Sequence, residues 1–183
     1  STLERLHRNI LTRNLVFDEA LEVVRGSSLF TTHTPVPAGH DAFSEDLLRA
    51  YLSNYDNDLN ISWQQFMGLG RLNEWDTNEK FSMSHLAACT CQEINGVSEI
   101  YGRVSRQMFN ELWQGYNAEE LHIDYVTNGV HYPTWIASEW HNLFTQTFGD
   151  DFLNDQSNKN HWRKIHDVDD EVLWQIRTNR RRI

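Results

Sequence analysis

Two short β-type segments of this 183-residue chain each lead directly into a loop of conformationally restricted residues, and this arrangement constrains the fold most. Residues 28–32 precede a loop, 33–41, that contains two of the three prolines and Gly39. Residues 122–126 alternate in polarity like a half-buried strand and precede the loop 127–135. Proline restricts its own φ and the residue before it, and Gly39 permits a positive φ. Because open α/β sheets bind ligands where their strands end, these loops are predicted to form a binding site.

Most of the remaining chain has the spacing of apolar residues expected of helices. Ser44, Ser62 and Ser82 each stand between apolar residues in the pattern of a helix N-cap with a hydrophobic staple. Helices are predicted at the N-terminus, before Gly26, at about 44–55, 62–69, 83–93 and 97–112, from Ser138 to Gly149, and after Asp169. The apolar face of the first helix is formed by Leu3, Leu6, Ile10 and Leu11, and the apolar stripe of 97–112 by Val97, Ile100, Tyr101, Val104, Met108 and Leu112. Gln65, at the third position of the helix after Ser62, predicts a capping box. Pro133 makes the residues after Asn128-Gly129 a poor returning strand, so a loop that leads into a helix is expected there. The sequence therefore predicts an α/β fold, helix-dominated, with few short strands.

Composition excludes several classes of protein and of site. A nucleic acid partner is not expected, because a formal charge of −10 opposes binding to phosphates. No membrane partner is expected either, since no apolar run approaches the ~18 residues that a spanning helix needs. The two cysteines, Cys89 and Cys91, are expected to be buried free thiols in a cytoplasmic setting. No metal site is expected, because His33 and His40 lack the compact spacing of metal ligands.

Three ordered motifs make a family resemblance specific. They are FTTHTPVPAGHDAF at 30–43, FSMSHLAACTCQEINGVSEIYGRVSRQMF at 81–109 and VTNGVHYPTW at 126–135. All three resemble segments of the α-glucan phosphorylases, the family of the glycogen, starch and maltodextrin phosphorylases. The proline-rich form of the first motif resembles the bacterial-type branch. The likeness runs in order through about residues 30–140 and continues more weakly to the end.

The resemblance implies a glycosyltransferase that uses pyridoxal 5'-phosphate and has two Rossmann-like domains of the GT-B type. Such enzymes transfer the non-reducing terminal glucosyl unit of α-1,4-glucan to phosphate, giving glucose 1-phosphate with retention. By the matched motifs, His33 would bind the glucosyl unit, largely through its main-chain carbonyl, and Asn128 would bind the sugar 6-hydroxyl. Trp135 would lie against the cofactor. The family also implies a cytoplasmic homo-oligomer with allosteric relatives.

The lysines depart from the family pattern. None of Lys80, Lys159 and Lys164 stands in the Gly/Ser-rich setting of the lysine that binds the cofactor covalently. The chain is therefore expected to be an internal fragment. Residues 1–127 would be the C-terminal part of the first domain, and residues 128–183 the junction and the start of the second. Alone, the fragment is expected to be inactive and to hold no covalent cofactor, its partners being the remaining halves of the parent chain.

Two other classes of function remain open from the residues. One is another two-domain glycosyltransferase that uses the same strand-end loops without pyridoxal 5'-phosphate. The other is a non-catalytic carbohydrate-binding or scaffold module, which the helical and acidic character of the chain also fits.

Overall fold

The computed structural model describes residues 1–181 and divides the chain into two compact units, one of residues 1–128 and a second that begins at Gly129. The elements of the first unit are α1 (Thr2–Arg13), α2 (Phe17–Arg25), β1 (Leu29–Thr32), β2 (Ala42–Phe43), α3 (Glu45–Leu52), α4 (Tyr55–Asp58), α5 (Trp63–Gly68), β3 (Phe81–Ser82), α6 (Met83–Cys89), β4 (Glu93–Gly96), α7 (Glu99–Phe109) and β5 (Ile123–Tyr125). Short 3-10 turns of this unit lie at Pro37–Gly39, Asn110–Leu112 and Ala118–Glu120. The elements of the second unit are α8 (Tyr132–Trp135), α9 (Ser138–Phe148), a 3-10 turn at Asp150–Leu153, α10 (Lys159–Arg163), a 3-10 turn at Lys164–Asp167 and α11 (Asp170–Arg181).

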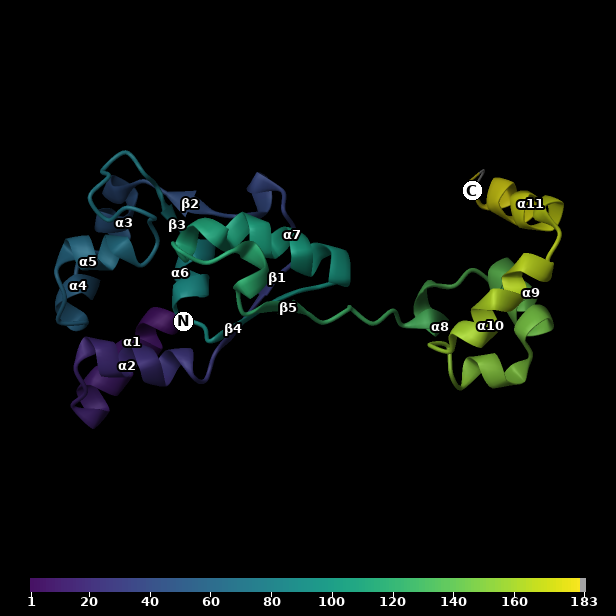
Figure 1. The fold of residues 1–183 in the computed structure, drawn as a ribbon, viewed down its shortest axis with the longest axis horizontal. Coiled ribbons are helices and arrows are strands. Elements are labelled where there is room, and N and C mark those ends of the chain that lie inside the picture. Colours follow the sequence, from purple (N-terminus) through teal and green to yellow (C-terminus); the bar gives the residue numbers. More distant parts are fainter. Residues whose placement is uncertain (182–183) are drawn as a thin grey trace. The chain divides into compact units, whose positions relative to one another are not determined.

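The first unit contains a three-stranded parallel sheet in the order β1-β4-β5 (Figure 1). Strands β1 and β5 confirm the two β-type segments predicted from the sequence. The predicted helix over 83–93 is wrong in its second half, because α6 ends at Cys89 and Glu93–Gly96 form β4. A four-residue strand between two neighbours is stabilised by pairing with residues distant in sequence, which local apolar spacing does not report.

Helix α7 packs against β4 and β5 with a face that differs in part from the predicted one. Tyr101, which the predicted apolar stripe included, is buried, whereas Ile100 of the same stripe is 72% exposed. The buried face continues through Ser105 to Phe109, one helical turn at a time. Phe109 then packs edge-on against Phe30 of β1, with ring centroids 6.0 Å apart. The C-terminal end of α7 therefore contacts β1 as well, through the ring pair of Phe109 and Phe30.

An apolar core of the first unit lies among helices α1, α2, α3, α5 and α6. Leu6, Phe66 and Phe81 are almost completely buried in it, and the rings of the two phenylalanines stack with centroids 5.7 Å apart. The predicted N-terminal helix is confirmed, although Leu11, expected on its apolar face, is 69% exposed. Gly26 ends α2 as predicted, but its φ of −63° is right-handed, so it is not a left-handed C′ glycine.

The second unit is a group of helices around an aromatic cluster. Helix α9 begins at Ser138 and ends before Gly149, whose φ is 86°, as the sequence predicted. Phe152 contacts Phe148 and Trp162 with centroid separations of 5.0 and 5.2 Å. The predicted loop into a helix after Asn128 is confirmed by α8. None of the described helices is long and apolar enough to cross a membrane. Together the units confirm the helix-dominated α/β fold with few short strands.

Candidate functional site

The carboxyl ends of β1, β4 and β5 lie side by side, because the three strands are parallel. Thr32 pairs with Gly96, and Gly96 pairs with Tyr125, so these three residues form one row across the sheet. His33 directly follows the first of them, and Asn128 follows the last by three positions. The structure therefore places two predicted site residues in loops at one edge of the sheet, on either side of β4. Parallel α/β sheets bind ligands at this edge.

Two main-chain hydrogen bonds hold the segment after β5 against the end of β4. The Val126 N–H donates to the Gly96 carbonyl at 2.9 Å, and the Asn128 N–H donates to the Val97 carbonyl at 3.1 Å. The backbone of Asn128 is thus fixed, while its side chain is exposed. A side-chain amide offers both donors and an acceptor, so Asn128 presents to the edge a group suited to a ligand hydroxyl.

The loop after β1 is closed by hydrogen bonds of its own. Pro37–Gly39 form a 3-10 turn, and the Gly39 N–H donates to the Val36 carbonyl at 2.8 Å. Gly39 does not adopt the positive φ that a glycine permits. The position needs a glycine for another reason, since a Cβ there would overlap the side-chain methyl of Thr34. His33, which opens this closed loop, has an exposed side chain.

His40 has a part in this loop that sequence reasoning missed. Its Nδ1 lies 2.6 Å from Ser84 Oγ on α6, and its Nε2 lies 2.6 Å from the Thr34 carbonyl oxygen. The two partners are 44 and 6 residues away in sequence, so no local pattern could have indicated the bridge. Among residues 1–181, no group of three or more His, Cys, Asp or Glu could hold a metal ion.

Trp135 lies in the other unit from His33 and Asn128. It ends α8, and its indole is 77% exposed. Its place beside a cofactor stays a prediction.

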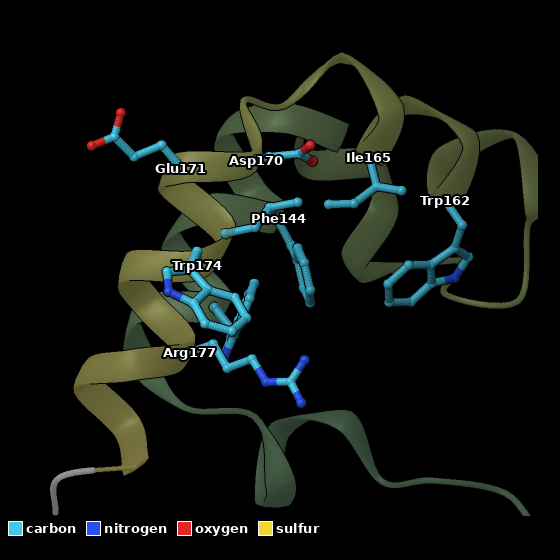
Figure 2. A pocket seen from close by; sticks show the side chains of 9 residues that line it. Phe144, Trp162, Ile165, Asp170, Glu171, Trp174 and Arg177 are labelled. Carbon is cyan, nitrogen blue, oxygen red and sulfur yellow. The ribbon is translucent and has the colours of Figure 1, made fainter.

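The second unit contains a cavity of about 730 Å³ that the sequence did not predict. Its lining residues come from α9, α10, α11 and the turns between them, and they are Trp140, Phe144, Trp162, Ile165, Asp170, Glu171, Leu173, Trp174 and Arg177. Figure 2 shows the side chains of Phe144, Trp162 and Trp174 around the hollow, whereas Glu171 points away from it. Polar groups that converge on one point usually orient a bound ligand, and this apolar hollow does not present such a set. The strand edge in the first unit is therefore the better candidate for chemistry.

The lysines do not fit a covalent site for an aldehyde cofactor. Lys80 and Lys159 are exposed, and Lys164 is also exposed while its Nζ donates to the Phe148 carbonyl at 3.2 Å. A lysine that forms a Schiff base is instead set in a desolvated pocket that lowers its pKa. The residues of this chain thus supply no attachment point for such a group.

Comparison with known proteins decides the family. The sequence profile of the carbohydrate phosphorylases matches residues 3–182. The chain belongs to the carbohydrate phosphorylase family. This confirms the resemblance carried by the three motifs, which lie within the matched range.

The phosphorylase relatives are similar to this chain over nearly all of its length. A glycogen phosphorylase of Mycobacterium tuberculosis is 41% identical over 98% of the chain, and a maltodextrin phosphorylase of Thermococcus litoralis is 34% identical over 94%. A glycogen phosphorylase of Aquifex aeolicus is 34% identical over 91%. The chain spans only about a fifth of these relatives, with 21%, 20% and 23% of their respective lengths matched.

Proposed function

We propose that this chain is part of an α-glucan phosphorylase and supplies strand-end loops that bind the terminal glucosyl unit. The enzyme would transfer that unit from α-1,4-glucan to phosphate and release glucose 1-phosphate with retained configuration. The observation that carries the proposal is the position of His33 and Asn128 in loops at one edge of a parallel sheet. Family membership and the names of the relatives support the same reaction.

The proposed division of the chain follows the family's two-domain GT-B architecture. Residues 1–127 would complete the first Rossmann-like domain, and residues 128–183 would form the junction and the start of the second. The partners would then be the glucan, phosphate and the rest of the enzyme chain, in a cytoplasmic homo-oligomer. Allosteric control, known in the family, would act on the whole enzyme.

In this proposal the chain's own residues bind and orient the sugar. The His33 main-chain carbonyl would accept a hydrogen bond from the glucosyl unit, and the Asn128 amide would bind the 6-hydroxyl. Fixed oxygen dipoles near the anomeric carbon favour the positive charge that develops there as the glycosidic bond breaks. The backbone of Asn128 is held in place by its bond to Val97, so little reorganisation is needed on binding.

The family implies pyridoxal 5'-phosphate in the whole enzyme, where its 5'-phosphate would supply proton transfer to the substrate phosphate. Trp135 would lie against it without a covalent bond. Because Lys80, Lys159 and Lys164 do not fit covalent attachment, that group would be anchored by residues outside this chain. The family match favours a phosphorylase over both alternatives left open by the residues, a glycosyltransferase without the cofactor and a scaffold module.

The test is Asn128→Ala in the full-length phosphorylase, assayed for phosphorolysis of maltoheptaose. We expect kcat/KM to fall by about fivefold to about 150-fold, because a sugar hydroxyl left without its partner costs about 1–3 kcal/mol. Asn142→Ala, an exposed asparagine on α9, is the matched control and should keep the wild-type value. Wild-type kcat/KM in Asn128→Ala would overturn the site assignment.

A further inference from the structure

The imidazole of His40 has both of its ring nitrogens engaged. Nε2 lies 2.6 Å from the Thr34 carbonyl oxygen, which can only accept, so Nε2 carries the hydrogen and donates. Nδ1 lies 2.6 Å from Ser84 Oγ and, in the neutral ring, accepts from that hydroxyl. The ring also meets Phe109 of α7 edge-on, with centroids 6.4 Å apart. Through its hydrogen bond to Ser84, His40 thus bridges the loop after β1 to helix α6.

The Thr34 residue that His40 holds is fixed by two further contacts. Its hydroxyl oxygen accepts from the Val36 N–H at 3.1 Å, and its methyl group packs where a Cβ on Gly39 would otherwise lie. The peptide plane that carries the His33 carbonyl ends at the nitrogen and Cα of Thr34. Fixing Thr34 therefore restricts the direction in which the His33 carbonyl points.

The other end of the bridge is anchored in the interior. Ser84 lies in the first turn of α6 and is 9% exposed. The same helix start is tied to the end of the loop, because the Met83 N–H donates to the Asp41 carbonyl at 2.9 Å. Next to it, Ala42 pairs with Ser82 across β2 and β3. A movement of the loop would therefore have to break contacts with a packed helix.

We infer that His40 is a positioning residue for glucosyl transfer. It orients the His33 carbonyl through its hydrogen bond to Thr34, and its hydrogen bond to Ser84 holds the imidazole in place. The inference rests on the proposed function, in which that carbonyl binds the glucosyl unit. In this role His40 acts through its hydrogen bond to Thr34. An imidazole suits the task because one nitrogen donates to a carbonyl while the other accepts from a hydroxyl.

The kinetic test uses the full-length phosphorylase with His40→Ala, His40→Gln and Ser84→Ala. We expect His40→Ala to lower kcat about tenfold or more with a change in KM for maltoheptaose below about threefold, because a misplaced carbonyl matters most in the transition state. The glutamine amide can still donate to Thr34, so His40→Gln is expected to recover most of the lost kcat. Ser84→Ala is expected to lower kcat about threefold, and it tests the inference even if His40→Ala does not fold.

The control is His122→Ala, which removes an exposed ring that precedes β5, at the opposite end of that strand from the site, and it should keep the wild-type kcat. A structural readout on the full-length phosphorylase is hydrogen exchange. His40→Ala should accelerate exchange of the Val36 and Gly39 amides about tenfold, whereas His122→Ala should not.

The outcomes separate this inference from the proposed function. Wild-type kcat in folded His40→Ala, alongside a large loss in Asn128→Ala, would overturn the role of His40 and leave the glucosyl site standing. Wild-type activity in Asn128→Ala would overturn the site itself. An equal kcat in His40→Ala and His40→Gln would also overturn the inference, because the bond to Thr34 would then have no effect.

Discussion

Gly96 at the end of β4 and Gly102 in α7 are in backbone contact. A Cβ on Gly96 would lie 2.8 Å from the main-chain nitrogen of Gly102, and a Cβ on Gly102 would lie 3.0 Å from the Cβ of Tyr125. The helix therefore lies directly on β4 and β5, and β5 is the strand that leads to Asn128. Because Val97 follows Gly96 and accepts from the Asn128 N–H, the position of this helix also fixes the backbone of Asn128.

Gly96→Ala is expected to destabilise the protein by about 1–3 kcal/mol, since the added methyl meets backbone that cannot rotate away. Urea unfolding followed by circular dichroism measures the change. Gly129→Ala is the matched control, because a Cβ there meets nothing within 4 Å, and its effect should stay within about 0.5 kcal/mol. Equal stability of the two variants would show that α7 does not lie this close to β4.

The loops of the candidate site could be predicted because proline, glycine and strand ends leave local signals. The strand that separates the two loops could not be predicted, since the four residues of β4 look like a continuation of α6. Strand β4 exists through hydrogen bonds to β1 and β5, about 65 residues before it and 30 residues after it in the chain. Local periodicity carries no information on such pairing.

The same limit applies to the bridge made by His40. The spacing of His33 and His40 argues against a metal site but does not indicate a role for His40, whose ring nitrogens lie against Ser84 and Thr34. The family motifs predict His33 and Asn128 as candidate site residues, but they do not show which tertiary contacts hold these residues in place. Close backbone approach, as between Gly96 and Gly102, is likewise invisible in a pattern of apolar side chains.

Glu45, the first residue of α3, forms a polar cluster with Trp63 and Arg71. Its carboxylate accepts from Trp63 Nε1 at 2.9 Å and pairs with Arg71, whose side chain is 2% exposed, at 3.1 Å. Burial alone would raise the pKa of Glu45, but hydrogen bonds from Trp63, Arg71 and Arg49 outweigh it and lower the pKa below its usual value. Glu45→Gln is therefore expected to cost about 1–3 kcal/mol of unfolding free energy at pH 7, since it leaves Arg71 buried without its countercharge.

Glu99→Gln is the control for that substitution. Glu99 pairs with Arg103 on the surface, where both side chains are 65% exposed, so its loss should cost less than about 1 kcal/mol. The contribution of Glu45 is present above the usual glutamate pKa and is lost as the pH falls through the lowered pKa. The gap between wild type and Glu45→Gln in urea unfolding should accordingly shrink in acid, and a gap that is constant from pH 7 to pH 3 would contradict it.

Ser62 and Ser44 give a matched pair of helix N-caps. Ser62 makes the predicted capping box, with its hydroxyl accepting from the Gln65 N–H at 3.1 Å and the Gln65 side chain accepting from the Ser62 N–H at 2.9 Å. Ser44 occupies the N-cap of α3 without a side-chain capping bond. Ser62→Ala is expected to cost about 0.5–2 kcal/mol, and Ser44→Ala clearly less, by thermal unfolding. The reverse order would contradict the assignment of the capping box.

His85, on α6 beside Ser84, should make the protein less stable in mild acid. Burial lowers the pKa of His85, as His40 does to a smaller extent, and together they outweigh Glu79, Glu111 and the Gly70 carbonyl, which favour the charged form. The unfolded chain takes up a proton below the ordinary histidine pKa of about 6.5, whereas the folded chain resists it. As the pH is lowered from about 6.5 to the lowered pKa of His85, the free energy of unfolding therefore decreases.

His85→Gln is expected to flatten this dependence, because the glutamine does not titrate. The measurement is urea unfolding between pH 7.5 and 4.5 for wild type, His85→Gln and His122→Gln, the last removing an exposed imidazole. His85→Gln should have a shallower slope than wild type over the window just below about pH 6.5, and His122→Gln is the control for loss of an imidazole. Identical slopes in wild type and His85→Gln would show that His85 titrates alike in the folded and unfolded chain, and its burial beside the loop would then be wrong.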